Sequence, residues 1–190
     1  MRSPRPRFCL RGLARLIVGT GLAVGLFLPV PGVRPASADT KLADLQIIAR
    51  SMGFLQPAPE GPVEVGIVYP AGSAEGQRQA EQLAAEFGSE VRVGRLILRP
   101  KLITADGLAK TDVPVLLLTE AVLAQAGGIA AEVAGRHILI VAPNADPVEA
   151  GLAVLAVQSQ PRVQIYVSRA AARNAGIVFA PAFRMMIQER

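Results

Sequence analysis

The sequence predicts an α/β protein, a small three-layer sandwich with a mostly parallel central sheet and an antiparallel hairpin near the C-terminus. Segments of strand length alternate with segments of helical periodicity, which is the order expected when helices connect parallel strands. The segment 113–118 (Val-Pro-Val-Leu-Leu-Leu) is apolar on both faces, as a strand covered by helices on two sides must be. About 150 residues follow the N-terminal segment, which is enough chain for one core without disulfides.

The first half of this chain alternates helix and strand twice. Leu42, Leu45 and Ile48 share one face of an N-terminal helix, and the three prolines within 56–62 cannot continue it, because proline removes a backbone donor and fixes φ. We expect a linker there. The expected elements are a helix at 39–50, a strand at 63–69, a helix at 73–87 that ends at Gly88, and one strand at 91–98 interrupted by Gly94.

The second half continues the alternation and then adds a hairpin. Asp146-Pro147 resembles a capped helix start, with Asp as N-cap and Pro as the first helical residue. The segments 152–157 and 163–167 flank a turn at 158–162, which predicts an antiparallel pair. The other expected elements are a helical turn from Thr104 or Asp106, a strand at 113–118, a helix at 121–134, a strand at 137–141, a helix at 170–175 ended by Gly176, and a terminal helix at 182–188.

Residues 1–38 have the three parts of a secretory signal peptide. Six of the 20 basic side chains and none of the 15 acidic ones lie there, so the chain from Asp39 carries 14 basic and 15 acidic groups. The apolar run Leu16–Val30 is about 15 residues long, short of the roughly 20 that a spanning helix needs, although an uncleaved anchor is the alternative. Ala36-Ser37-Ala38 predicts cleavage before Asp39. We therefore expect a periplasmic protein with no nucleic-acid partner and no stable membrane insertion.

The mature sequence offers few groups for catalysis. Cys9 is the only cysteine and lies in the leader, so the mature chain has no thiol for a disulfide, a metal or a nucleophile. His137 is the only histidine and opens an apolar strand; a strand-end residue is the simpler interpretation, a catalytic residue the alternative. No cluster of His, Asp and Glu has metal-ligand spacing. The sequence predicts a non-enzyme without metal or cofactor.

Two segments leave a binding role open. Gly72 and Ser73 follow the first strand and open a helix, where α/β proteins hold ligands, although an ordinary turn explains the same residues. If the protein binds a small ligand, we expect the site to be a crevice at these strand ends. A basic cluster around the second strand is either a charged edge strand or an anion site; its members are Arg92, Arg95, Arg99 and Lys101.

The segment Arg162–Ile177 (RVQIYVSRAAARNAGI) has the pattern of a strand followed by an Ala-Ala-Arg-x-Ala-Gly helix. Together with Asp112–Thr119 and Gly135–Val141, it resembles the YfiR-like family of exported α/β proteins. The resemblance covers most of 63–186, and we expect 63–190 to be a single YfiR-like domain after an N-terminal helix and linker at 39–62. The chain departs from the family at Ala180-Pro181, where members have a Ser-Ser pair, and it lacks the cysteines of the best-known members.

The resemblance implies a non-enzymatic periplasmic regulator. Such a protein would bind the periplasmic sensing part of an inner-membrane diguanylate cyclase or sensor kinase and so act in cyclic di-GMP or related signalling. Apolar side chains near the last helix are the candidate partner-binding residues, with core packing as the alternative: Phe179, Phe183, Met185 and Met186. An exposed edge strand or the terminal helix could also support a homodimer.

A competing prediction is a periplasmic small-molecule-binding module that serves a transporter or a sensor. A parallel α/β sheet is a common ligand-binding scaffold. However, binding proteins that close around their ligand usually have two lobes, and about 150 residues supply only one. An enzyme of unrecognised type is the third class. Its one candidate group is His137.

Overall fold

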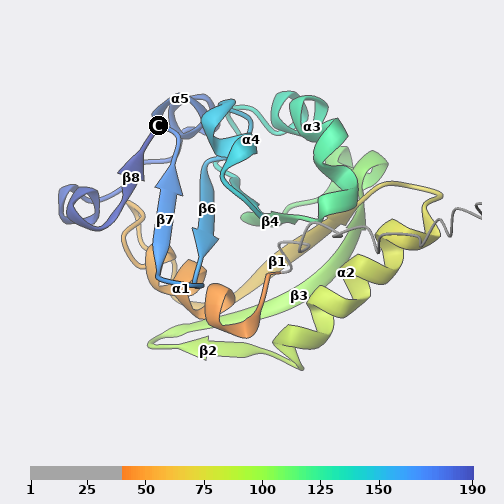
Figure 1. Cartoon of the computed structure of the whole chain (residues 1–190), viewed down its shortest axis with the longest axis horizontal. Helices are drawn as coiled ribbons and strands as arrows, with labels where there is room; N and C mark the ends of the chain where they lie inside the picture. Colours follow the sequence, from red (N-terminus) through yellow and green to blue (C-terminus); the bar gives the residue numbers. More distant parts are fainter. Residues whose placement is uncertain (1–39) are drawn as a thin grey trace, which may run out of the picture. The chain divides into compact units, whose positions relative to one another are not determined.

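The computed structural model describes residues 40–190, and the predicted signal peptide lies outside them. These residues belong to one compact unit. One sheet of eight strands runs through it in the order β2-β3-β1-β4-β5-β6-β7-β8 (Figure 1). The strands are β1 (Gly61–Tyr69), β2 (Val91–Val93), β3 (Leu96–Thr104), β4 (Val115–Leu118), β5 (Leu139–Ala142), β6 (Leu155–Gln158), β7 (Gln164–Val167) and β8 (Gln188–Glu189).

The pairing confirms the predicted fold class. Strands β3, β1, β4, β5 and β6 are parallel neighbours, whereas β2 is antiparallel to β3 and β7 is antiparallel to β6. The β6–β7 pair is the hairpin expected near the C-terminus. The sheet is therefore mostly parallel, with an antiparallel strand close to each edge.

Helices on both faces make the three layers. The helices are α1 (Leu42–Met52), α2 (Ala74–Phe87), α3 (Ala126–Glu132), α4 (Asp146–Glu149) and α5 (Arg169–Ala175); the 3-10 helices are η1 (Ala105–Lys110), η2 (Glu120–Gln125) and η3 (Pro181–Met186). In Figure 1, α3 and α4 lie on one side of β1 and β4, and α1 and α2 lie on the other. Two apolar cores result, one under α1 and α2 and one under η1, η2, α3 and α4.

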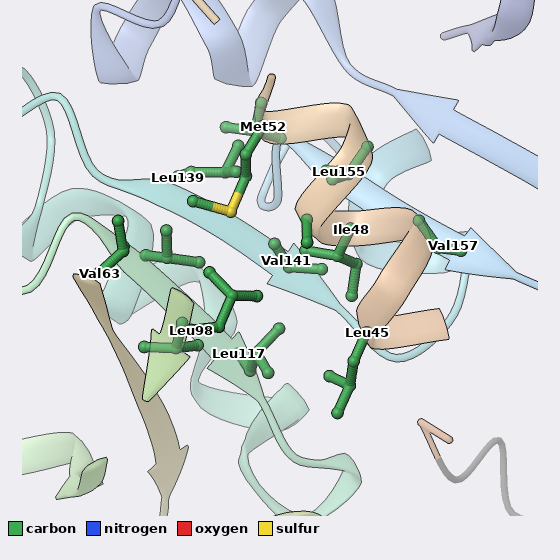
Figure 2. Packing of buried hydrophobic residues seen from close by; sticks show 14 of the residues in the cluster. Leu45, Ile48, Met52, Val63, Leu98, Leu117, Leu139, Val141, Leu155 and Val157 are labelled. Carbon is green, nitrogen blue, oxygen red and sulfur yellow. The ribbon is translucent and has the colours of Figure 1, made fainter. Parts of the chain in front are cut away.

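Helix α1 is part of the domain core. Leu45, Ile48 and Met52 are at most 3% exposed and point from one side of the helix toward side chains of the sheet (Figure 2). Their spacing of three and four residues places them on one face. Strand β1 also begins at Gly61, within the predicted linker. The division of the sequence at residue 62 therefore does not separate two structural units.

The predicted single strand at 91–98 is wrong, because this segment is a hairpin. Gly94 has a φ of 61°, a conformation that glycine adopts without steric cost, and the chain reverses there between β2 and β3. Strand β3 then continues through Pro100, which pairs with Val65 of β1. β2 pairs with β3 only as far as Leu98, so Pro100 lies where that side of β3 is an open edge and no partner strand needs its missing N–H.

Three predicted helices differ from the helices in the structure. The segment 121–134 forms the 3-10 helix η2 and the short helix α3, which contains the poor helix formers Gly127 and Gly128. The terminal helix is the 3-10 helix η3, followed by β8. Helix α4 has Ala145 rather than Asp146 as its N-cap, and the Asn144 side chain accepts the Asp146 N–H at 3.1 Å.

The predicted strand at 137–141 begins two residues late, because His137 has a φ of 56° and cannot join a ladder. The predicted end of α5 at Gly176 is confirmed. The Ser168 hydroxyl accepts the Ala171 N–H at the start of α5, and Gly176 ends this helix with a φ of 73°. Within residues 40–190, none of the helices has the length and apolar character that crossing a bilayer requires.

Candidate functional site

The turn after β1 is a structural turn. Gly72 has a φ of 70° and is exposed, and Ser73 is the N-cap of α2. The Ser73 Oγ accepts the Gly76 N–H at 3.0 Å, so this oxygen is already engaged by the helix. Neither residue lines the cavity found at this edge of the sheet.

The cavity lies one strand further along, at the carboxyl ends of β4 and β5. We call it the strand-end crevice, and it has a volume of about 360 Å³. The connection that leaves β1 runs toward β3, while the connection that leaves β4 runs toward β5. Ligands of open α/β sheets bind where neighbouring connections diverge in this way. The lining residues are Thr40, Lys41, Gln79, Gln82, Leu83, Glu86, Leu118, Thr119, Glu120 and Pro143.

Helix α2 provides one wall of the crevice. Gln79, Gln82, Leu83 and Glu86 are three, four and seven residues apart, so they share one face of the helix. Leu83 is buried against the core. The Gln79 Oε1 accepts the Ala121 N–H of η2 at 3.0 Å, which joins this wall to the loop after β4.

The loop after β4 provides the floor and is fixed by two hydrogen bonds. Thr119 is 4% exposed, and its hydroxyl donates to the Val68 carbonyl at 2.9 Å. The Glu120 Oε1 accepts a bond from the Asn144 side chain at 3.1 Å, which joins the ends of β4 and β5. These bonds hold one carboxylate at a defined place in the crevice.

The N-terminal end of α1 closes the rim with groups of both charges. The Glu86 Oε2 accepts the Leu42 N–H at 3.2 Å, which holds α1 against α2. The backbone N–H of Lys41 donates to the Asp44 carboxylate at 2.9 Å. The side-chain ammonium group of Lys41 forms no ion pair within residues 40–190. The crevice thus combines one ammonium with two carboxylates and two amides.

The four predicted partner-binding residues do not form one surface. Phe183 is 0% exposed and stacks between Phe54 and Phe179, with ring centroids 5.0 and 4.9 Å apart. Phe183 is therefore a core residue and presents no surface to a partner, which corrects the prediction for this position. Met185 and Met186 are 93% and 57% exposed.

Each member of the basic cluster of the second strand contacts a carboxylate. Arg92 and Arg99 both contact Glu90, Arg95 contacts Glu60 at 3.0 Å, and Lys101 contacts Glu64 at 2.9 Å; the Arg99 distance is 3.3 Å. The hydrogen bond from Arg92, and then the attraction of both guanidinium groups, hold the pKa of Glu90 below its usual value against the opposing effect of burial. The charged edge strand is the interpretation that the contacts favour. His, Cys, Asp and Glu side chains form no group of three suited to a metal within residues 40–190.

Comparison with known proteins supports the fold class of this chain and nothing more specific. No family model and no curated protein matches the chain, so the resemblance to the YfiR-like family stays a prediction. An ABC domain from Streptococcus pneumonia, solved in complex with L-Trp, has a TM-score of 0.52 and 11% identity over 77% of this chain and 60% of its own length. A conserved domain protein from Vibrio cholerae O1 biovar El Tor has a TM-score of 0.50 and 14% identity over 78% and 59%. At such identities the similarity shows a shared α/β fold.

The chain spans about 60% of the length of these two solved structures. Sequence reasoning expected a ligand site at the carboxyl edge of the sheet, and a cavity is present at that edge. None of the lining residues was predicted, because they come from the segment before α1, from α2, from the end of β4 and from the loops after β4 and β5, which only the fold brings together.

Proposed function

We propose that this protein is a periplasmic small-molecule-binding module whose ligand occupies the strand-end crevice. The observation that carries the proposal is the position of the crevice at the carboxyl ends of parallel strands, where their connections diverge, with its polar groups already fixed by hydrogen bonds. The periplasmic location rests on the sequence of residues 1–38.

The charges around the crevice favour a zwitterion of amino-acid size. The Lys41 ammonium suits a ligand carboxylate, whereas Glu86 and Glu120 suit a ligand ammonium group. Gln79 and Gln82 add amide donors beside the apolar side chains of Leu83 and Leu118. The ABC domain of similar fold was solved with L-Trp, which makes the amino acids the first compounds to test.

The test is a thermal-shift panel of amino acids and other small metabolites on the purified protein. A ligand at 100 times its dissociation constant stabilises the native state by about 2.7 kcal/mol, which raises Tm by roughly 5–10 °C for a domain of this size. We expect Glu120→Gln to reduce the rise and Glu60→Gln to preserve it. Glu60 is an exposed carboxylate outside the crevice. A panel without any shift would refute the proposal.

A second candidate function is the regulation of an inner-membrane signalling protein, as the resemblance implies. The observation that favours it is the pair of exposed methionines on η3, Met185 and Met186, held beside the buried anchor Phe183. Methionine is an adaptable contact residue that is enriched at protein interfaces.

Crosslinking of the protein in the membranes of its host tests this candidate. The variant Met185→Ser/Met186→Ser should lose a crosslinked cyclase or kinase, whereas Val163→Ser should keep it. Val163 is a matched control, since it is 58% exposed and lies at the β6–β7 turn. Equal capture by both variants would exclude the methionines as the contact.

A further inference from the structure

A second cavity lies at the opposite edge of the sheet, at the amino ends of β4 and β5. Its volume is about 370 Å³, within the range of small-molecule sites. Its walls are mostly apolar. They include Leu55, Pro57 and Pro59 from the segment between α1 and β1, and Ile177 and Val178 from the segment after α5. His137 lines the same cavity and brings an ionisable ring to it.

His137 is held there in an unusual backbone conformation. Within residues 40–190 it is the only residue other than glycine with a positive φ, 56°. Its N–H donates to the Ala175 carbonyl at 3.0 Å, and the nearby Gly135 N–H donates to the Asn174 carbonyl at 2.9 Å. These bonds satisfy carbonyls at the end of α5 and hold the turn in place. Residues in such conformations cluster at binding sites, where the surrounding structure must hold them.

The imidazole ring of His137 is exposed and lies against Gly176 at the end of α5. Its Nδ1 lies 2.9 Å from the Gly176 carbonyl, and because a carbonyl only accepts, Nδ1 carries the proton. A Cβ at Gly176 would lie 2.7 and 2.8 Å from the Cε1 and Nδ1 of the ring, so the ring is seated directly over this glycine. In the neutral ring, Nε2 is then an acceptor, and it has no hydrogen-bond partner within residues 40–190.

We propose that this cavity is a second ligand site, for a small, mainly apolar ring compound with one hydroxyl group that donates to His137 Nε2. The apolar walls supply affinity by burial, and the Nε2 acceptor of His137 orients the hydroxyl; Gln56 is the other lining residue with a polar side chain. The site lies at the other ends of the strands from the strand-end crevice and shares no lining residue with it. Its existence is therefore independent of the proposed function.

A matched pair of probes tests the proposal on the purified protein: 4-propylphenol and propylbenzene, which differ only in the hydroxyl group. Titration calorimetry should show that the phenol binds about tenfold more tightly, which is the effect of one net hydrogen bond. The His137 Nε2 resonance in ¹⁵N NMR should move with the phenol and not with propylbenzene. Equal affinities, or no binding of either probe, would overturn the proposal.

Two variants locate the site. Asn tolerates a positive φ, so His137→Asn should keep the turn and remove the preference for the phenol over propylbenzene. Val178→Trp should fill the cavity and abolish the binding of both probes. The control is Val163→Trp, because both valines are more than half exposed and tolerate a large side chain. If the probes still bind to Val178→Trp, this cavity is not their site. That result contradicts the proposal even if His137→Asn does not fold.

Discussion

Single residues in this protein have roles that their type alone does not reveal. Met185 and Phe183 are two positions apart and were equal candidates for a partner surface, yet one is 93% exposed and the other is 0% exposed. Residues two positions apart point to different sides of a helix, and in η3 the Phe183 ring points inward, between Phe54 and Phe179. Helical periodicity separates the two side chains but does not tell which of them is buried.

The burial of Phe183 leads to a stability prediction. Phe183→Ala should lower the free energy of unfolding by about 3–5 kcal/mol, because it removes a stacked ring and leaves a cavity. Met185→Ala should change the value by less than about 0.5 kcal/mol, since this side chain is exposed. Urea unfolding of both variants decides the matter. A loss of less than about 1 kcal/mol for Phe183→Ala would contradict the core assignment.

The ion pairs of Glu90 predict a dependence of stability on pH. The pKa of Glu90 is lower in the folded protein than in the unfolded chain, chiefly because of the hydrogen bond from Arg92. The ionised carboxylate therefore stabilises the fold above the unfolded value of about 4.3, and this stabilisation is lost as the pH falls through the folded value.

Glu90→Gln should accordingly be less stable than the parent protein by a constant amount between pH 5 and 8, and the difference should shrink as the pH falls below the unfolded value of about 4.3. The measurement is urea unfolding of both proteins across this range. The control is Glu132→Gln, at a carboxylate that forms no ion pair within residues 40–190. A difference that grows toward low pH would have the wrong sign for this explanation.

Helices with clear apolar periodicity and capping residues were predictable from the sequence, whereas a hairpin that depends on a single turn residue was not. Helix α2 and its ends at Ser73 and Gly88 follow from periodicity and caps, and so do the start and end of α5. The β2–β3 hairpin was missed because apolar residues continue on both sides of Gly94. The break in alternation between Val93 and Leu96 was the available sign, since these residues are an odd number of positions apart.

Two glycines test these element assignments in opposite directions. Gly94→Ala should destabilise the protein by about 1–2 kcal/mol, because a β-carbon is disfavoured at a φ of 61°. Gly128→Ala should stabilise it by about 0.4–1 kcal/mol, because Gly128 lies in α3 and a Cβ there meets no atom within 4 Å. Thermal unfolding compares the two. Stabilisation by Gly94→Ala would show that the turn is misplaced.

At the scale of the whole molecule, two cavities lie at opposite ends of the same parallel strands, β4 and β5. The sequence predicted the layers and the edge where a ligand site belongs, because these follow from strand composition and chain direction. It could not predict the strand order, in which β1 lies between β3 and β4. That order alone brings Lys41, Glu86 and Glu120 to one crevice from three distant parts of the chain. The predicted homodimer and membrane partner stay predictions.

The measurement that most directly tests the central claim is an NMR titration of the isotope-labelled protein with amino acids. If the strand-end crevice binds a zwitterion, saturable amide shifts should concentrate at residues 118–120, Asn144 and the crevice face of α2 from Gln79 to Glu86. The same shifts should weaken in Glu120→Gln. An absence of saturable shifts, or shifts confined to residues remote from the crevice, would contradict the account.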